Sequence, residues 1–329
     1  MLPEPLVEVT RGDLTESVHH GHIVVADANG RILYQLGDPF FNFCLRSCAK
    51  PLQALPLISS GAADKYRLTP PELAVMSGSL NGQNFQVEAI QSILDKIGVG
   101  EQHLQCGVHP PSHRSTAKKL QEEGKKPSTL HNNCAGKHAA MLMLCAYYGW
   151  PFEHYIRMEH PVQSLMRETI SSVSEVPVQH IGIGIDGCGV PVFSLPLASL
   201  ARSYARLASG SDPATCRLMD AALSHPEMIA GDERVCTDIM RALGRKVFAK
   251  TGAEGGYAMS FMEKGWGVAI KIADGSSRAL NPVVMETLRQ LGILTGEEAV
   301  RLKPYCRPAL YNHRKEIVGE IKSRFDLMG

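Results

Sequence analysis

Ser47 and Lys50 stand three residues apart in the segment FCLRSCAKPLQALPLISSG, residues 43–61. Apolar residues recur behind them at helical spacing, so both side chains are expected on one face of the first turn of a helix. In such an S-x-x-K pair the lysine amine can take the proton of the serine hydroxyl and make the oxygen a nucleophile. A second copy of the pattern, Ser115 to Lys118, lies in a stretch rich in lysine and glutamate that we expect to be solvated surface.

Two further motifs accompany the first pair. Ser79-Leu80-Asn81 follows an apolar stretch, and Lys250-Thr251-Gly252 ends an expected strand. The order S-x-x-K, S-x-N, K-T-G is the signature of penicillin-recognising serine enzymes, in which the second serine and the strand lysine relay a proton and stabilise charge. Two simpler interpretations stay open, because a serine that begins a helix is often a cap and K-T-G can be a turn. The spacing from Ser47 to Ser79 is also much shorter than in typical β-lactamases.

A thiol cluster is the second candidate for chemistry. Cys134, Lys137 and His138 begin an expected helix in HNNCAGKHAAM, and Asp186 and Cys188 lie in the glycine-rich turn GIDGCGVP. Two thiolates with a nitrogen or a carboxylate would suit zinc. The spacing is not that of a C-x-x-C pair, and free cysteines are commonly small buried apolar residues. From the residues alone His138 is favoured over Lys137 as a ligand, since a lysine must lose its proton to bind a metal.

The surrounding elements predict an α+β fold. HGHIVVADANGRILYQL, residues 20–36, indicates a hairpin around Asn29-Gly30, whereas helical periodicity dominates residues 46–179. Strand patterns return after that region. We therefore predict an antiparallel sheet built from N- and C-terminal segments and flanked by helices. Residues 1–45 with 180–329 would form the sheet lobe, 46–179 a mainly helical lobe, and the active site would lie in the cleft of one intertwined unit.

Composition limits the function classes. The net charge of +1 offers no basic surplus for binding nucleic acid. No signal peptide is visible, and the longest apolar helix candidate is too short to cross a bilayer. Nine scattered cysteines indicate a reducing, cytoplasmic environment. Phosphate-loop, dinucleotide-binding and metalloprotease spacings are missing, so the expected partner is a small-molecule substrate, with neither nucleic acid nor membrane.

Several blocks of the chain resemble a known family. RSCAKPLQALPL, SGSLNGQ, HNNCAGKHAAML, GIDGCGVPVF, GDERVCTDIM and AKTGAEG are similar to the rhizobial-type L-asparaginases, also called the asparaginase II family. The resemblance runs from about residue 8 to residue 322. It implies hydrolysis of L-asparagine to L-aspartate and ammonia, the fold shared by serine β-lactamases and glutaminases, and a homodimer.

The resemblance also implies roles for particular residues. It assigns catalysis to two serine–lysine tandems, zinc binding to two cysteines and a lysine, and the substrate pocket to an arginine and an aspartate whose charges suit an amino acid. In this sequence these positions are Ser47 with Lys50 and Ser79 with Lys250; Cys134, Lys137 and Cys188; and Arg46 and Asp186. Lys264 and Lys271 are additional lysines near the end of the chain, and Lys264, expected at an exposed hairpin tip, is the rival to Lys250.

The functional hypothesis is an L-asparagine amidohydrolase that works through an acyl-enzyme. Ser47, deprotonated through Lys50, would attack the amide carbon, and Ser79 with Lys250 would pass a proton to the departing ammonia. Which serine is the nucleophile is left open. One alternative is a glutaminase or a β-lactam-interacting serine hydrolase on the same fold, because a substrate that differs by one methylene is only weakly discriminated by a binding pocket. The other is a catalytically inactive zinc-binding sensor.

Overall fold

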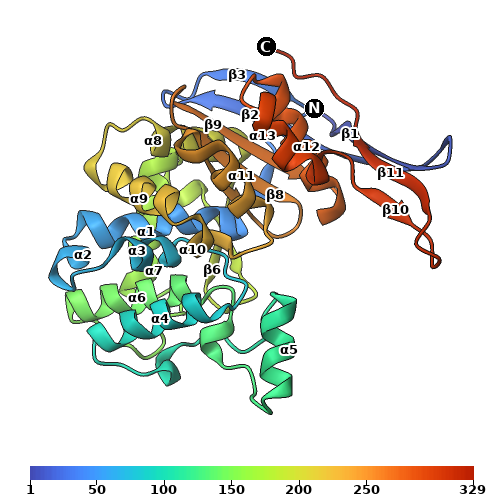
Figure 1. Cartoon of the computed structure of the whole chain (residues 1–329). Coiled ribbons are helices and arrows are strands. Elements are labelled where there is room, and N and C mark those ends of the chain that lie inside the picture. The colour runs from blue at the N-terminus through green and yellow to red at the C-terminus, as the bar shows by residue number, and fades with distance from the viewer.

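An eight-stranded antiparallel sheet joins the two ends of the chain in the computed structural model, which describes residues 1–329 (Figure 1). The strands follow the order β10-β11-β1-β2-β9-β8-β7, and β3 pairs with β2 off this path. They are β1 (Glu4–Arg11), β2 (Leu14–Asp27), β3 (Ile32–Leu36), β7 (Val247–Thr251), β8 (Gly256–Phe261), β9 (Trp266–Ile272), β10 (Ala309–Tyr311) and β11 (Ile317–Ser323). The hairpin predicted around Asn29-Gly30 is confirmed by the pairing of β2 with β3.

Helices cover this sheet because its central strands are apolar on both faces. Ile23, Val24, Val25 and Ala26 are consecutive in β2 and all fully buried. Helix α8 (Leu197–Ala208) packs against β2, β8 and β9, whereas α12 (Ser277–Gln290) packs against β1 and β11. Next to them α11 (Val235–Leu243) packs against β7, and α13 (Gly296–Cys306) packs against α11 and α12.

The middle of the chain is helical and forms the other half of the view in Figure 1. Helix α1 lies among α3, α6, α7 and α9, so α9 and α10 pack with the helices of the middle region although they follow it in sequence. The helices are α1 (Lys50–Ser59), α2 (Ala62–Lys65), α3 (Pro70–Met76), α4 (Asn84–Lys96), α5 (Arg114–Glu122), α6 (Ala135–Tyr148), α7 (Pro161–Ser174), α9 (Pro213–Ser224) and α10 (Pro226–Ala230). Short 3₁₀ turns are η1 (Arg46–Ala49), η2 (Glu101–His103), η3 (Thr129–His131), η4 (Val178–His180) and η5 (Gly244–Lys246).

A second, smaller sheet connects the two parts. It has the order β4-β6-β5, with β4 (Asn42–Cys44), β5 (Gly182–Ile185) and β6 (Pro191–Pro196). Strand β4 leads directly into η1 and α1, and the backbone N–H of Leu45 donates to the carbonyl of Phe193 in β6 at 2.9 Å. One continuous cluster of 86 buried apolar residues runs through sheet and helices. The halves therefore share a single core.

The predicted fold class is confirmed: an antiparallel sheet made by the N- and C-terminal segments is flanked by helices, and the middle of the chain is mainly helical. None of the helices combines the length and the apolar character needed to span a membrane.

Candidate active site

The hydroxyl of Ser79 lies between two lysine side chains that come from different elements. The Nζ atom of Lys50, the first residue of α1, is 3.1 Å from Ser79 Oγ, and Nζ of Lys250 in β7 is 2.8 Å from the same oxygen. At most 1% of the surface of Lys50 and of Lys250 is exposed, and Ser79 is also buried. The three residues are far apart in sequence, so the fold has built a buried hydroxyl with an amine on each side.

The loop that carries Ser79 is held by its backbone. The Ser79 N–H donates to the carbonyl of Ile229 at 2.7 Å, and the Leu80 N–H donates to the carbonyl of Asn133 at 3.1 Å. The side-chain oxygen of Gln86, in the first turn of α4, accepts from the N–H groups of Asn81 and Gly82 at 3.1 and 3.2 Å. These contacts satisfy buried donors that would otherwise be costly, and they fix the direction of the Ser79 side chain.

Lys50 is anchored by a backbone oxygen. Its Nζ donates to the carbonyl of Asn133 at 2.8 Å, and the same carbonyl accepts from Leu80. Pro51 follows Lys50 in the first turn of α1, where the lack of an N–H costs nothing. The carbonyl of Asn133 thus links the S-x-x-K turn to the S-x-N loop.

Ser47 lies one turn before, in η1, and is only half-buried. Its hydroxyl makes no hydrogen bond with another protein group, and Lys50 turns toward Ser79 instead. The turn itself is tied to its neighbours, because Tyr204 Oη donates to the carbonyl of Cys48 at 2.8 Å and Cys48 Sγ lies 3.6 Å from the carbonyl oxygen of Lys250. Ser47 is therefore the more accessible of the two serines, and Ser79 the one with two amine partners.

Burial and, in the same direction, the positive charge of Lys50 together lower the pKa of Lys250 to about 7. A fully buried ammonium loses its hydration, and a second ammonium beside it opposes protonation. The neutral Lys250 amine can then accept a proton from the Ser79 hydroxyl near neutral pH.

Arg46 and Asp186 form an ion pair beside the serines. Arg46 Nε is 2.7 Å from Asp186 Oδ1, and Lys137 Nζ is 3.4 Å from Asp186 Oδ2. Burial would raise the pKa of the Asp186 carboxyl, but Lys137 and Arg46 outweigh it and lower the pKa to about 2. Asp186 is therefore a carboxylate at neutral pH, and Arg46 brings a positive charge next to it.

The thiol cluster lies beside the Asp186 carboxylate. Donor atoms of Cys134, Asp186 and Cys188 all lie within 4.8 Å of one another, and Lys137 Nζ is 3.2 Å from Cys188 Sγ. A hydrogen bond with Cys188 and the nearby lysine charges lower the pKa of Cys134, so a thiolate is favoured there. Two sulfurs, a carboxylate and an amine fit the preferences of zinc.

Lys137 fits this set only as a neutral amine. Burial would lower its pKa, but Cys134, Cys188 and Asp186 raise it, so the side chain is an ammonium when no metal competes for the sulfurs. His138, the ligand favoured by residue chemistry, points elsewhere: its Nδ1 is 2.6 Å from Tyr155 Oη. The structure thus places Lys137, and not His138, in the cluster.

The remaining lysines lie where the sequence predicts. Helix α5, which carries the second S-x-x-K, has no buried residue, and Lys118 pairs with Glu122 at 3.4 Å on its surface. Lys264 is exposed in the turn between β8 and β9, as expected. The rival sites therefore contribute nothing to the Ser79 centre.

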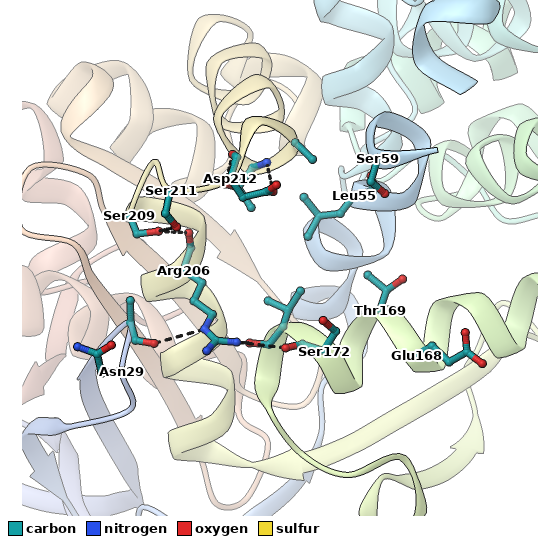
Figure 2. A pocket seen from close by; sticks show the side chains of 14 residues that line it. Asn29, Leu55, Ser59, Glu168, Thr169, Ser172, Arg206, Ser209, Ser211 and Asp212 are labelled. Carbon is teal, nitrogen blue, oxygen red and sulfur yellow. Dashed lines mark hydrogen bonds between the residues drawn. The ribbon is translucent and has the colours of Figure 1, made fainter. Parts of the chain in front are cut away.

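A cavity of about 810 Å³ lies away from Ser47 and Ser79. Figure 2 shows it between α1, α7 and the region around α8 and α9, with Arg206 crossing one wall. Arg206 donates to the carbonyls of Ala28, Ser172 and Val173 and pairs with Glu175, so its charge is already used. A second cavity, of about 460 Å³, is lined by Arg46 and adjoins the site.

Some groups that position the site cannot be recognised from residue types in the sequence. The carbonyl of Asn133 and the carbonyl of Ile229 position Lys50 and Ser79, but every residue has a carbonyl and nothing in the sequence marks these two. Gln86 has a faint signal, because a glutamine three residues after the polar residue that precedes a helix is typical of a capping box.

Comparisons with known proteins identify relatives of the chain. The family model described as L-asparaginase II matches residues 7–323. No curated protein sequence matches the chain.

Solved structures show weaker likeness. The native form of a protein called Mglu is 15% identical, with a TM-score of 0.48, over 85% of this chain and 67% of that one. A putative β-lactamase from Bacteroides dorei is 11% identical, with a TM-score of 0.44, over 81% and 92% of the two chains. A β-lactamase from Mycobacterium bovis is 14% identical, with a TM-score of 0.35, over 82% and 94%. At these TM-scores the likenesses support no conclusion about substrate.

Proposed function

Because the chain belongs to the L-asparaginase II family, we propose that it hydrolyses the side-chain amide of free L-asparagine to L-aspartate and ammonia. One observation carries the proposal: Ser79 Oγ lies within 3.1 Å of two buried lysine amines. Burying a lysine side chain costs stability, so two buried lysines on one hydroxyl favour a catalytic role. Amide hydrolysis needs a nucleophile, a base and an acid in contact.

The proposed reaction begins at Ser47. Lys50 passes a proton through the Ser79 hydroxyl to the neutral Lys250 amine and takes up the proton of the Ser47 hydroxyl in its place. Ser47 Oγ attacks the amide carbon, and an aspartyl ester forms as the C–N bond breaks. Ser79 passes a proton from Lys250 to the departing ammonia. Water then cleaves the ester, and the chain of Lys50, Ser79 and Lys250 returns the protons. The hydrogen bonds that join Ser79 to both lysines support this relay.

Arg46 and Asp186 are proposed to hold the substrate by its charges. The guanidinium would donate to the α-carboxylate, and the Asp186 carboxylate would accept from the α-ammonium. The support is their position, since Arg46 directly precedes Ser47 in the chain and bonds to Asp186. Such contacts would also reject amides that lack the amino-acid group.

A zinc ion is proposed to bind Cys134, Lys137 and Cys188, with the Asp186 carboxylate adjacent. When bound, zinc would supply positive charge near the serines and keep Lys137 deprotonated. Without zinc, Lys137 is an ammonium whose ion pair with Asp186 orients both side chains, and we expect this pair to keep the Asp186 carboxylate facing the pocket.

Ammonia release from L-asparagine, with L-glutamine and nitrocefin assayed beside it, tests the proposal. Release from asparagine alone supports an asparaginase. Turnover of glutamine in its place would indicate a glutaminase, and turnover of nitrocefin would indicate a β-lactam hydrolase. Inactivity on all three substrates would favour the zinc-binding sensor.

Two further properties complete the proposal. A homodimer is expected and is tested by light scattering on the purified chain, where a monomer mass would overturn it. A cytoplasmic location is proposed from the nine cysteines, all of which are free thiols in the structure.

A further inference from the structure

A cavity of about 460 Å³ adjoins the serines through Arg46 and contains a lysine that the proposed reaction does not use. Its walls include Phe43 of β4 and Ile185 of β5, and its polar side chains include Arg46, Glu254 and Lys271. It therefore combines apolar walls with charges of both signs, a pattern typical of sites for small charged ligands.

The pairing of strands places Lys271 on the same face of the sheet as Lys250, two strands away. Lys250 in β7 is opposite Ala258 in β8, and Ala258 is opposite Ala269 in β9. Directly opposed residues share a face of the sheet, and so do residues two apart on one strand. Lys271 thus projects from the same face as Lys250, displaced along the sheet toward the cavity.

The Lys271 ammonium has one hydrogen free for a ligand. Its Nζ donates to the carbonyls of Glu254 and Ile272 at 2.5 and 2.6 Å, and no carboxylate lies within ion-pairing distance. Only 9% of the residue is exposed. An ammonium has three donors, and two of those of Lys271 are used by backbone carbonyls, so one is left to donate to a carboxylate ligand.

Arg46 also has hydrogen-bond donors without a partner in the protein. Its Nε bonds to Asp186, whereas its two terminal nitrogens have no hydrogen-bond partner in the protein. The backbone of Arg46 has φ 46° and that of Glu254 has φ 56°, both in the left-handed region that side chains other than glycine rarely adopt. Both residues line the cavity, and the fold holds both in a conformation that their own backbone preferences disfavour.

We infer that this cavity is a carboxylate-binding subsite, in which Lys271 Nζ and the terminal nitrogens of Arg46 bind a small dicarboxylate such as an acidic amino acid. Phe43 and Val192 would contact the methylene groups of that ligand. The inference uses the proposed function only to choose L-aspartate as a probe, because a hydrolysed asparagine leaves a second carboxylate where the amide was.

The test is calorimetric binding of L-aspartate and of succinate to the full chain, without turnover. Lys271→Met is expected to lose about tenfold or more in affinity for both, since a charge-assisted hydrogen bond is removed. Lys271→Arg keeps the charge and is expected to retain most of the affinity. Thermal melting of each variant shows that it is folded.

A second pair of variants avoids the buried lysine altogether. Ile185 lines the cavity and is 84% exposed, whereas Ile183 on the same strand is exposed but does not line it. Ile185→Glu should weaken dicarboxylate binding by about fivefold through repulsion, and the matched control Ile183→Glu should leave it unchanged.

Unchanged affinity in Lys271→Met and in Ile185→Glu would overturn the subsite. Equal weakening by Ile183→Glu would also overturn it, because the effect would then come from general surface charge. Binding that depends on Lys271 in a protein that hydrolyses no amide would uphold the subsite and refute the proposed function, so the two fail separately.

Discussion

Ser79 is held by two amines that cannot both be charged at low cost. Lys50 and Lys250 lie 3.1 and 2.8 Å from one oxygen, and both are buried. Burial and mutual repulsion favour a neutral amine on one of them, and Lys250, with its pKa lowered to about 7, is that residue. The serine hydroxyl then bridges a donor and an acceptor, which is the arrangement that proton relay requires.

The two serines should respond differently to replacement. Ser47→Ala removes the proposed nucleophile, so no acyl-enzyme forms and ammonia release falls to background. Ser79→Ala keeps the nucleophile but breaks the relay, and we expect kcat to fall by about 10²–10⁴-fold. Mass spectrometry of protein quenched during turnover should show an aspartyl adduct in Ser79→Ala and none in Ser47→Ala. The exposed Ser115→Ala is the control, and an adduct that persists in Ser47→Ala would make Ser79 the nucleophile.

Activity should rise with pH through about 7. The neutral form of Lys250 is the active one, and its pKa is about 7, so kcat/KM should increase up to that pH and then level off. A rate that is flat from pH 5.5 to 8.5 would exclude Lys250 as the titrating base.

The same lysine should make stability depend on pH. Above about 7 the folded chain holds Lys250 neutral, whereas the unfolded chain keeps it protonated up to about its ordinary 10.5. The unfolded state therefore binds more protons in this window, and the free energy of unfolding rises with pH by at most about 1.4 kcal/mol per unit. Lys250→Met lacks this term, so its stability advantage over the native chain should be greatest at or below pH 7 and shrink toward pH 10. Parallel urea titrations of both proteins that differ by a constant amount would contradict this.

At the scale of elements, the site depends on how closely α6 approaches α3. A side chain on Gly136, in the first turn of α6, would put its Cβ 2.2 Å from the carbonyl oxygen of Val75 in α3. Glycine lets the two backbones touch. This contact places Cys134 and Lys137, at the start of α6, beside the loop that leaves α3 toward Ser79.

Gly136→Ala should therefore separate the two helices. We expect a loss of about 1–3 kcal/mol in the free energy of unfolding, as for other overpacked cores, together with reduced activity from a displaced Ser79 loop. Gly256→Ala is the matched control, because that glycine is also buried and its added Cβ would meet nothing closer than 3.4 Å. Equal stability of Gly136→Ala and the native chain in denaturant would refute the close packing.

At the scale of the whole molecule, the site is a meeting point of segments that are distant in sequence. Arg46 comes before α1 and Asp186 follows β5, yet their side chains are 2.7 Å apart. Cys134 precedes α6, whereas Cys188 lies between β5 and β6. Any ion that holds both sulfurs would connect the helical region to the small sheet.

Zinc should therefore stabilise the entire fold. A ligand that binds only the folded chain adds about 2.7 kcal/mol to the free energy of unfolding at a free concentration of 100 Kd. The melting temperature should therefore rise with added zinc and fall with a chelator. Cys188→Ala should abolish this response, and Cys216→Ala, at an exposed cysteine, should keep it. A melting temperature that zinc leaves unchanged in the native chain would rule out the proposed site.

Much of this arrangement was predictable from local patterns. The hairpin at Asn29-Gly30 follows from turn chemistry, and the helical middle follows from apolar periodicity. The motifs and the family resemblance predict the four residues Ser47, Lys50, Ser79 and Lys250. The structure brings Lys50, Ser79 and Lys250 into contact and leaves Ser47 in the adjacent turn without a hydrogen-bond partner.

The sequence alone determined which elements form and which residue types are available for chemistry, because turn signals, periodicity and motifs act over a few neighbouring residues. Only the tertiary structure decided which partners those residues have. In the folded chain Lys50 contacts Ser79, and Lys137 lies beside Cys188 whereas His138 does not. Lys271 lines a cavity together with Arg46. The physical reason is that these contacts depend on strand register, helix packing and backbone carbonyls, which are properties of the folded chain and leave no local mark in the sequence.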